Sequence, residues 1–306
     1  MLTVTVPDQT LRDRLADLPV DLHTWDLASA DGAPDGAVDL VVMPFMAPAS
    51  TLGVLDGLPV RAVQSQALGY DHVADVLAPD VAFANAAGVH EAATAEHTLA
   101  LVLAAQRDLP RFVGEQVTGD WDQRFAPGLV GRTVVLVGVG GVGEEIRRRL
   151  VPFDVEVVRV ASHARTDDLG PVHGVDELAD LVPGADVLVL AVPLNGGTRH
   201  LADGRLLAAM RPGALVVNVG RGPVVDTDAL LAAVRDGRVR AALDVVDPEP
   251  LPADHPLRTT PGVLLTPHVA GRTTTMTDRV VALLRTQIEH LAAGDPLDHL
   301  VDLRRA

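Results

Sequence analysis

Short apolar runs separated by helical segments recur along the second half of the chain. From Thr133 onward they read TVVLVG, VEVVRVA, ADVLVLAV, ALVVNVG, RAALDVV and VLLTPH. Near-continuous apolar runs are typical of parallel strands that helices cover on both faces. The spacing leaves room for a crossover helix between successive strands, so the pattern predicts a doubly wound parallel sheet in an α/β protein.

A looser set of the same kind precedes this block, with strands expected at LTVTV, DLVVMP, VRAVQSQ and VAFANA. It predicts a smaller, flavodoxin-like α/β domain. Residues 90–109 have apolar positions at helical intervals and no Gly or Pro before residue 110, which predicts one long helix between the two blocks. A second amphipathic helix from Thr275 is expected to pack back against the first domain. The predicted domains are therefore residues 1–95 with 275–306, and residues 96–274.

The length and hydropathy fit two globular domains, because 306 residues with 48% hydrophobic side chains exceed what one core usually serves. No apolar run approaches the roughly 20 residues that cross a bilayer. The amino terminus, MLTVTVPDQT, lacks a basic start and a cleavable apolar segment, and it reads as a first strand. We expect a cytoplasmic protein that does not enter a membrane.

Two residue types are missing from the chain, and each absence excludes some chemistry. Without cysteine there are no disulfides, no thiolate catalysis and no cysteine-ligated zinc. Without lysine there is no Schiff base and no P-loop. The net charge of −16 opposes binding to nucleic acid, which needs positive charge to displace counterions. His90 and His97 lie seven apart on one predicted helix without a further ligand set, so no metal site is predicted.

The segment TVVLVGVGGVGEEIRRRL carries a glycine fingerprint between a predicted strand and a predicted helix. Gly138, Gly140 and Gly143 stand in G-x-G-x-x-G spacing, with Gly141 and Val142 at the start of the helix. The first glycine allows a tight turn, the second allows backbone to approach a pyrophosphate, and the third allows close packing of helix on strand. This context predicts a Rossmann-type domain that binds a dinucleotide.

The end of the next strand bears on which dinucleotide is bound. NAD-binding domains normally carry an Asp or Glu about 20 residues after the fingerprint, where it accepts hydrogen bonds from ribose hydroxyls. Here the strand ends at Ala161 and is followed by Ser162, His163 and Arg165. Arginine suits a 2′-phosphate, so NADP is favoured over NAD. The alternative is an ordinary polar loop in which Asp167 or Asp168 reaches back to the ribose.

Motifs along nearly the whole chain resemble one family of oxidoreductases. They are QSQALGYDHV, AEHTLALVLA, GDW, GRTVVLVGVGGVG, AVPLNGGTRHL, NVGRGPVVDTDAL, ALDVVDPEPL and LLTPHVAG. In this order they resemble the D-2-hydroxyacid dehydrogenases, which include glyoxylate and hydroxypyruvate reductases. The resemblance implies hydride transfer between nicotinamide and C2 of a small 2-keto or 2-hydroxy acid. It also implies that residues 1–95 with 275–306 bind the substrate, that residues 96–274 bind the dinucleotide, and that the protein is a homodimer.

The resemblance assigns roles to single residues of these motifs. It implies a catalytic set of Arg221, Glu249 and His268. It places Asp244 near the nicotinamide carboxamide and the backbone amides of Leu68 and Gly69 at the substrate carboxylate. Further residues expected along the cofactor are Val192, Pro193, Val219 and Gly271.

The catalytic set suits reduction of a ketone. The oxygen that becomes an alkoxide needs a proton from an acid within hydrogen-bond reach. An imidazole titrates near neutrality, and a nearby carboxylate favours its protonated form, so His268 paired with Glu249 fits this role. Arg221 is permanently charged and forked, so it can grip a carboxylate and polarise a carbonyl. Arg221, Asp244 and His268 each follow a predicted strand, and they are expected to converge at one edge of the sheet.

Alternatives and departures complete the picture. Formate-type relatives carry glutamine where Glu249 stands, which argues against that chemistry. A binding protein of the same fold that senses nicotinamide redox state, like a corepressor, could keep the catalytic residues and stays an alternative. Asp154 stands where the family usually has glycine, and charged Arg159 interrupts a strand that is normally apolar. Neither of these two residues is expected to bear on the chemistry.

Overall fold

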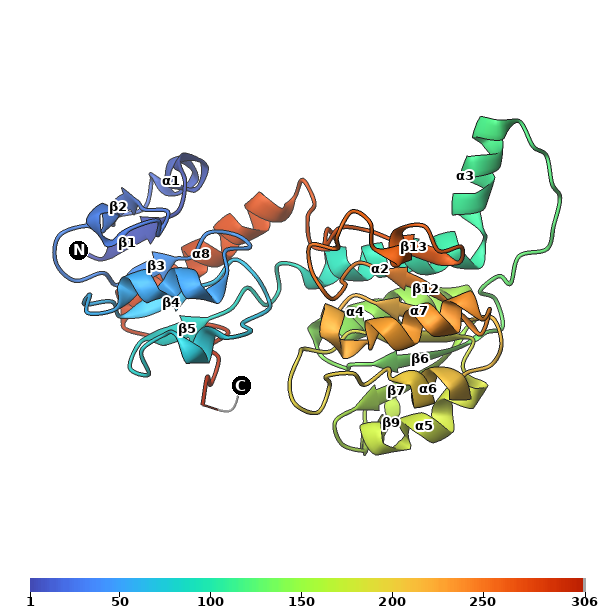
Figure 1. The fold of residues 1–306 in the computed structure, drawn as a ribbon. Coiled ribbons are helices and arrows are strands. Elements are labelled where there is room, and N and C mark those ends of the chain that lie inside the picture. Colours follow the sequence, from blue (N-terminus) through green and yellow to red (C-terminus); the bar gives the residue numbers. More distant parts are fainter. Residues whose placement is uncertain (305–306) are drawn as a thin grey trace. The chain divides into compact units, whose positions relative to one another are not determined.

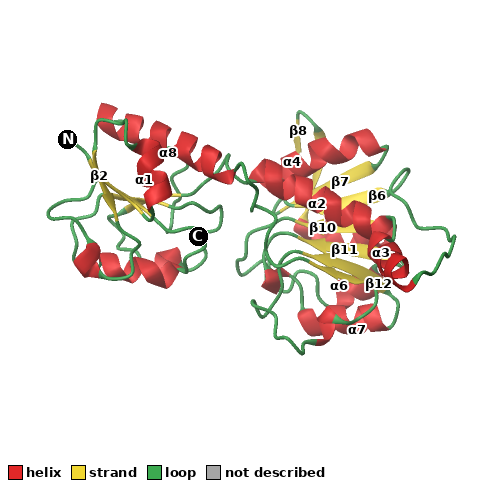
Figure 2. Ribbon diagram, turned by 90° about the horizontal axis from the view of Figure 1, so that it is seen from above, coloured by secondary structure: helices red, strands yellow, loops and turns green. Residues whose placement is uncertain are grey.

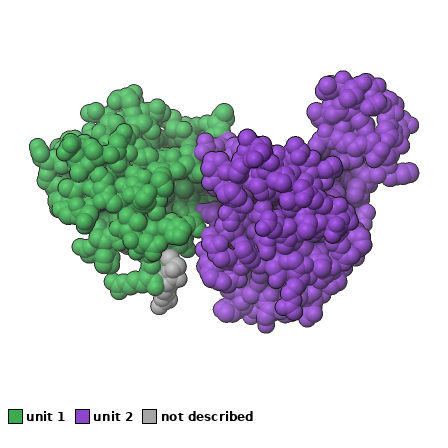
Figure 3. Space-filling view, viewed as in Figure 1, with its two compact units in different colours: residues 1–90, 273–306 green, residues 91–272 purple. Residues whose placement is uncertain are grey.

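The computed structural model describes residues 1–304 and divides the chain into two compact units. Unit 1 comprises Met1–His90 and Thr273–Ala306, and unit 2 comprises Glu91–Arg272 (Figure 3). These borders lie between residues 90 and 91 and between 272 and 273, whereas the sequence predicts them after residues 95 and 274. In both divisions the first unit is discontinuous and encloses the second in the chain.

Unit 1 is built on a five-stranded parallel sheet in the order β2-β1-β3-β4-β5. The strands are β1 (Thr3–Val6), β2 (Asp21–Thr24), β3 (Leu40–Val42), β4 (Ala62–Gln64) and β5 (Ala82–Ala84). This order is the flavodoxin-like one, so the predicted fold class of this unit is confirmed. The sequence analysis missed β2 because this edge strand, DLHT, is polar and half-exposed and has no apolar run.

Helices cover both faces of this sheet. On one face lie α1 (Gln9–Leu15) and α8 (Met276–Ala293), and on the other lie the 3-10 helices η2 (Ala49–Leu55) and η3 (Val73–Asp75) (Figure 2). A further 3-10 turn, η1, spans Ala30–Gly32. Val280, Leu284 and Ile288 of α8 are buried in one cluster with Val4 and Leu40. The helix predicted from Thr275 therefore completes the core of the unit that the amino terminus begins.

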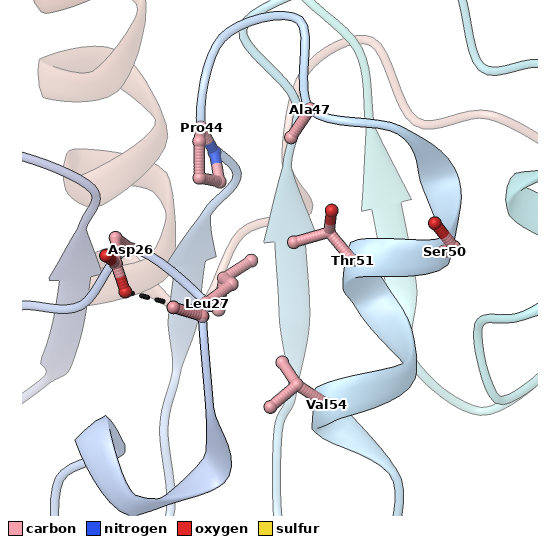
Figure 4. A pocket seen from close by; sticks show the side chains of 8 residues that line it. Asp26, Leu27, Pro44, Ala47, Ser50, Thr51 and Val54 are labelled. Atoms are coloured by element: carbon pink, nitrogen blue, oxygen red, sulfur yellow. Dashed lines mark hydrogen bonds between the residues drawn. The ribbon is translucent and has the colours of Figure 1, made fainter.

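An open depression of about 490 Å³ lies in unit 1 beside η2 (Figure 4). Its lining residues come from the segments after β2 and β3 and from η2: Asp26, Leu27, Ala28, Pro44, Ala47, Ser50, Thr51 and Val54. The Asp26 carboxylate accepts a hydrogen bond from the Ala28 amide at 3.0 Å, so it is used in a local turn. None of the lining residues is one of the site residues predicted from the sequence.

Unit 2 is built on an eight-stranded sheet in the order β13-β12-β11-β10-β6-β7-β9-β8. The strands are β6 (Thr133–Val137), β7 (Glu156–Ala161), β8 (Arg165–Asp167), β9 (Gly170–Gly174), β10 (Val187–Leu190), β11 (Ala214–Asn218), β12 (Val239–Leu243) and β13 (Val263–Leu265). Every neighbouring pair is parallel except β8 and β9. The six predicted strands are all present, and the Rossmann-type fold is confirmed. The β8–β9 hairpin is additional.

Two helical layers cover this sheet (Figure 2). The helices are α2 (Glu91–Gln106), α4 (Gly141–Leu150), α5 (Leu178–Leu181), α6 (Gly204–Ala209) and α7 (Thr227–Arg235), with 3-10 turns η4 (Val151–Phe153), η5 (Val175–Glu177), η6 (Val182–Gly184), η7 (Gly222–Val224) and η8 (Pro256–Arg258). Val135 packs in the cluster that contains Leu230 of α7, whereas its neighbour Val134 packs in the cluster that contains Val102 of α2 and Ile146 of α4. Successive residues face opposite layers, which explains why the central strands are apolar throughout.

The single helix predicted over residues 90–109 is shorter in the structure. It ends at Gln106, and Asp108 adopts the left-handed conformation with φ 57°, which breaks the helical path. A separate helix, α3 (Leu109–Thr118), starts directly afterwards and extends away from the sheet of unit 2 (Figure 1). The spacing of apolar residues does not predict this break, because it depends on the backbone conformation of Asp108. Within residues 1–304 no helix is long and apolar enough to cross a membrane.

The second strand of unit 2 explains one departure from the family pattern. Asp154, between η4 and β7, has φ 53° and ψ 44°, in the left-handed region where glycine carries no steric penalty. Asp and Asn are the side chains that tolerate this region best. The turn into β7 therefore has a backbone shape that a glycine would adopt without strain.

Candidate active site

The glycine fingerprint forms the turn between β6 and α4. Gly138 has φ 110°, and a Cβ added there would lie 2.4 Å from the carbonyl oxygen of Ala191. A Cβ on Gly143 would lie 1.9 Å from the carbonyl oxygen of Gly138. Gly140 is the residue that precedes the first turn of α4. The first and third glycines are thus required by close backbone contacts, and the free amides of the helix amino terminus suit a pyrophosphate.

A carboxylate lies beside this turn. The Cγ and Oε1 atoms of Glu91, the first residue of α2, would lie 2.9 Å and 3.2 Å from a Cβ on Gly141. Any larger residue at position 141 would displace this side chain. The backbone contacts at Gly138 and Gly143 keep the turn tight, and its shape fits a dinucleotide. Val142 follows in the first turn of α4.

The residues predicted to hold the adenosine end lie around the carboxyl end of β7. Ser162 and His163 are exposed in the turn after the strand, and Arg165 is the exposed first residue of β8. The guanidinium of Arg165 donates a long hydrogen bond, at 3.5 Å, to the carbonyl of His163. Three polar side chains of different chemistry thus stand at the position where an NAD-binding domain carries an acid.

The loops after β10 and β11 touch each other at the same edge of the sheet. A Cβ on Gly220 would lie 2.5 Å from the carbonyl oxygen of Val192, so the two backbones are in contact. The amide of Val219 donates to the carbonyl of Leu190 at 3.1 Å, which joins the ends of the two strands. Val192, Val219 and the neighbouring Pro193 therefore lie at the carboxyl ends of β10 and β11, beside the fingerprint turn.

Arg221 sits on a loop whose backbone is held from two sides. The buried side chain of Asn218 donates to the carbonyl of Arg221 at 2.8 Å and accepts from the amide of Gly220 at 3.1 Å. A Cβ on Gly222 would lie 1.9 Å from the carbonyl oxygen of Val246. The Arg221 loop is therefore seated directly on the backbone that leads from β12 towards Glu249.

Asp244, at the end of β12, organises the loop that carries His268. It is 2% exposed, and its carboxylate accepts hydrogen bonds from the hydroxyl of Thr266 at 2.6 Å and from the amides of Val269 and Ala270 at 3.0 Å each. The amide of His268 donates to the main-chain carbonyl of Asp244 at 2.8 Å. One buried carboxylate thus fixes residues 266–270, and Gly271 follows directly.

The charge of Asp244 is maintained in spite of its burial. Burial alone raises the pKa of this carboxyl, but hydrogen bonds from His97, Thr266, Val269 and Ala270 outweigh it and lower the pKa to about 2. Hydrogen bonds to the charged form have this effect on a carboxylate. Asp244 is therefore ionised at neutral pH, and the loop it holds does not loosen by titration there.

His97 of α2 is a residue of this cluster that the sequence analysis set aside. Its Nε2 lies 2.9 Å from the Thr266 hydroxyl and 3.4 Å from Oδ1 of Asp244. Because the Thr266 hydroxyl donates to Asp244, it accepts from Nε2–H of His97. His97 stands between Glu96 and Thr98 in a polar stretch of the helix, so the sequence does not reveal its partner 169 positions away.

His268 and Glu249 form a close pair at this edge. Nδ1 of His268 lies 2.5 Å from Oε1 of Glu249, and both side chains are partly exposed. His268 has φ 53°, a left-handed backbone conformation that the Asp244 contacts hold in place. The carboxylate occupies Nδ1, so Nε2 is the ring nitrogen that can meet a substrate. The pair has the geometry of an oriented acid–base group.

The residues predicted at the substrate carboxylate lie in unit 1, in the segment after β4. The carbonyl of Leu68 accepts from the Asn85 side chain at 3.0 Å. Within residues 1–304, the amides of Leu68 and Gly69 donate no hydrogen bond. Nearby, His90 stacks on Phe45 with ring centroids 5.8 Å apart, and its Nε2 lies 2.6 Å from the carbonyl oxygen of Gln66. The segment offers two amides to an anion.

No group of three or more His, Cys, Asp or Glu side chains in the described part of the chain could hold a metal ion.

Comparisons with known proteins agree with this geometry. The family model described as D-isomer specific 2-hydroxyacid dehydrogenase, NAD binding domain, matches residues 99–270. A glyoxylate reductase of Thermofilum pendens is 32% identical over 81% of this chain and 77% of its own length. An (S)-sulfolactate dehydrogenase of Chromohalobacter salexigens is 36% identical over 72% of this chain and 74% of its own.

Solved structures of the same kind are also similar. A D-isomer specific 2-hydroxyacid dehydrogenase from Xanthobacter autotrophicus Py2, in complex with NADPH and MES, has a TM-score of 0.82 to this chain. The two are 27% identical, and the similarity covers 99% of this chain and 98% of that one.

Proposed function

Because this chain belongs to the D-isomer specific 2-hydroxyacid dehydrogenases and is an NAD(P)-dependent oxidoreductase, we propose that it reduces small 2-keto acids with His268 as the general acid. The observation that carries the proposal is the pair of Nδ1 of His268 and Oε1 of Glu249 at 2.5 Å. It leaves Nε2–H for the substrate oxygen. In the reverse direction neutral His268 takes the proton of the alcohol.

The remaining residues prepare the carbonyl for this step. The nicotinamide ring supplies the hydride when the cofactor is bound. Arg221 binds the substrate carboxylate and polarises the carbonyl, so that negative charge grows on the oxygen as C2 is reduced. Nε2 of His268 delivers a proton to that oxygen, and Glu249 stabilises the imidazolium before the transfer and orients the ring throughout. We propose the amides of Leu68 and Gly69 as further partners of the substrate carboxylate.

The direct test is turnover. Purified protein with NADPH and glyoxylate, hydroxypyruvate or phenylpyruvate should consume the cofactor, followed by absorbance at the nicotinamide band, and the product should be the D-isomer where it is chiral. Glyoxylate is included because relatives of 32% identity are named glyoxylate reductases. If NADPH binds with micromolar affinity but no 2-keto acid in a broad panel is reduced, the redox-sensing alternative is correct instead.

For the cofactor we propose a preference for NADP over NAD, supported by Arg165, Ser162 and His163 after β7. Arg165→Ala should raise KM for NADPH about 10- to 100-fold, because a charge-assisted hydrogen bond to phosphate contributes about 1.5–3 kcal/mol. KM for NADH should change little, since NADH lacks the 2′-phosphate. Steady-state kinetics with both cofactors measure the ratio. Arg235→Ala, at the exposed end of α7, is the control, and an unchanged ratio in the Arg165 variant would contradict the preference.

We propose a homodimer that forms through α3 and the loop after it. This segment exposes large apolar side chains: Leu109, Val113, Val117 at 85%, Trp121 at 89% and Phe125. None of the residues of α3 is buried. A monomer rarely exposes an apolar patch of this extent. The family resemblance makes a second copy of the chain the expected partner.

The dimer predicts a mass near twice 32.1 kDa in sedimentation or light scattering. Trp121→Asp combined with Val117→Asp should shift this mass to that of the monomer, because two charges cannot be buried unpaired in an apolar interface. Val151→Asp changes a valine elsewhere in unit 2 that is 52% exposed, and it should leave the mass unchanged. A wild-type protein that is monomeric at micromolar concentration would refute the proposal.

A further inference from the structure

A buried arginine lies inside β7, the strand that leads to the cofactor residues. Arg159 is 6% exposed, and its Nη1 and Nη2 donate to the two carboxylate oxygens of Asp167 at 2.9 Å and 2.8 Å. Nη2 also donates to the carbonyls of Gly170 at 2.8 Å and Pro171 at 3.3 Å. A buried charge is tolerated when it is paired and hydrogen-bonded, and Arg159 has a bidentate carboxylate partner and two carbonyl acceptors.

These contacts tie β7 to the β8–β9 hairpin. In the hairpin, Asp167 pairs with Gly170 beside the turn. Strand β9 pairs with β7 at two positions, Val160 with His173 and Ala161 with Gly174. Arg159 adds a third link, near the turn of the hairpin, by binding Asp167 of β8 and the carbonyls of Gly170 and Pro171 of β9. Segment 162–165 is therefore held at both ends, by β7 before it and by the anchored β8 after it.

The direction of the hairpin decides which side chains stand near the adenosine end. Because β9 runs parallel to β7 and reaches its carboxyl end at Gly174, the path back from Gly174 to Gly170 leads towards the amino end of the sheet. Four residues of strand span about 13 Å. The turn that carries Asp167 and Asp168 thus lies well below the carboxyl edge where a dinucleotide binds. Arg165, at the start of β8, pairs with Val172 and therefore lies two residues closer to that edge than Asp167 does.

The Asp167 carboxylate is occupied as well as distant. It is bound by Arg159 and accepts a further hydrogen bond from the Leu169 amide at 2.9 Å. The guanidinium of Arg159 holds the pKa of this carboxyl below its usual range, so Asp167 is ionised and its charge is compensated inside the hairpin. The first acid after β7 is therefore not available to a ribose hydroxyl. The ion pair with Arg159 therefore argues against the alternative in which Asp167 binds the ribose hydroxyls of NAD.

We propose that Arg159 is a positioning residue for coenzyme choice, which anchors the β8–β9 hairpin through Asp167 so that Ser162, His163 and Arg165 face a 2′-phosphate. The sequence analysis expected Arg159 to have no bearing on the chemistry, and this inference revises that expectation. It rests on the NADP preference proposed above. The new claim is that Arg159, which does not contact the cofactor, determines the preference for NADP by anchoring the hairpin.

The test measures the Kd of NADPH and of NADH by fluorescence titration, which does not depend on turnover. Arg159→Met keeps an unbranched side chain of similar length and removes every hydrogen bond to the hairpin. We expect Kd for NADPH to rise about 10-fold or more and Kd for NADH less than about 3-fold, because the released segment loses its order at the phosphate-binding side chains. Arg240→Met is the matched control, since Arg240 lies on β12 and donates to the carbonyls of Ala105 and Gly213.

The outcomes separate this inference from the cofactor proposal. If wild-type protein binds NADH as tightly as NADPH, the proposed preference for NADP is refuted, and with it the role of Arg159 in that preference. If wild-type protein prefers NADPH and folded Arg159→Met keeps the same ratio of Kd values, the role of Arg159 is refuted and the preference stands. A loss of equal size in Arg240→Met would also refute it.

A second variant keeps the inference testable if Arg159→Met does not fold. Asp167→Asn changes a residue that is 37% exposed and retains one acceptor oxygen for Arg159. It weakens the anchor without removing the buried guanidinium. We expect Kd for NADPH to rise about 3-fold, with Kd for NADH unchanged within error, since the anchor loses the carboxylate charge and one of the two oxygens that bind Arg159. An unchanged ratio in folded Asp167→Asn overturns the proposal.

Discussion

Replacing His268 by asparagine is expected to lower kcat for the reduction of a 2-keto acid about 10²- to 10⁴-fold, the usual contribution of a general acid. Kd for NADPH should stay within about 2-fold of the wild-type value, because Asp244 and not the imidazole holds residues 266–270. Asparagine is chosen over alanine because His268 has φ 53°, a conformation that asparagine tolerates. Single-turnover rates and fluorescence titration measure the two quantities separately.

The backbone conformation also provides a matched control for this variant. His200 lies in the same unit, is exposed and has φ 51°, so His200→Asn makes the same chemical change at the same backbone geometry. It should leave kcat unchanged. Equal loss of kcat and of NADPH affinity in His268→Asn would mean that the histidine supports the loop and does not carry the proton.

Replacing Arg221 by lysine is expected to lower kcat/KM for a 2-keto acid about 10²- to 10³-fold. Lysine keeps the charge but cannot form two parallel hydrogen bonds with a carboxylate, and loss of one partner in a buried charge pair costs about 2–5 kcal/mol. KM should rise and kcat should fall together, since the residue is assigned both to the carboxylate and to the carbonyl. Steady-state kinetics with graded substrate concentrations resolve the two effects.

The structure supplies a way to separate this role from support of the loop. The backbone of Arg221 is held by Asn218, and Gly222 packs on Val246, and neither contact involves the guanidinium, whose Nη1 donates to the carbonyl of Gly220 at 2.7 Å. Arg221→Lys should therefore melt within a few degrees of wild-type protein, as should the control Arg205→Lys on the exposed side of α6. A normal kcat/KM in a folded Arg221→Lys would remove the residue from the proposed mechanism.

Local sequence patterns were sufficient to predict the main strands of unit 2 and the dinucleotide-binding turn. Each of the six apolar runs after Thr133 forms a strand, because residues buried on both faces of a sheet must be apolar at every position. The fingerprint glycines were predictable for the same kind of reason, since a positive φ and a close backbone contact leave no room for a side chain. The strand-then-loop order of the motifs also indicated that Arg221, Asp244 and His268 belong to one edge.

Features that lack an apolar signal were not predictable. The edge strand β2 and the β8 strand are polar and exposed, so no periodicity marks them. The end of α2 at Gln106 depends on a left-handed Asp108, a choice that the preceding apolar positions do not encode. In each case a backbone hydrogen bond or a backbone torsion fixes the element, and the apolar pattern of the side chains does not mark it.

The sequence by itself determined the α/β class, the sheet of unit 2, the dinucleotide turn and the family, because these depend on burial periodicity and on residues a few positions apart. Only the tertiary structure decided which polar residues work together. His97 of α2 contacts Thr266, which lies 169 positions later in the chain. Arg159 of β7 binds Asp167 of the β8–β9 hairpin, which the sequence pattern did not predict. Such hydrogen bonds form between side chains that the folded chain brings close together. The local sequence of one strand or helix does not specify these partners.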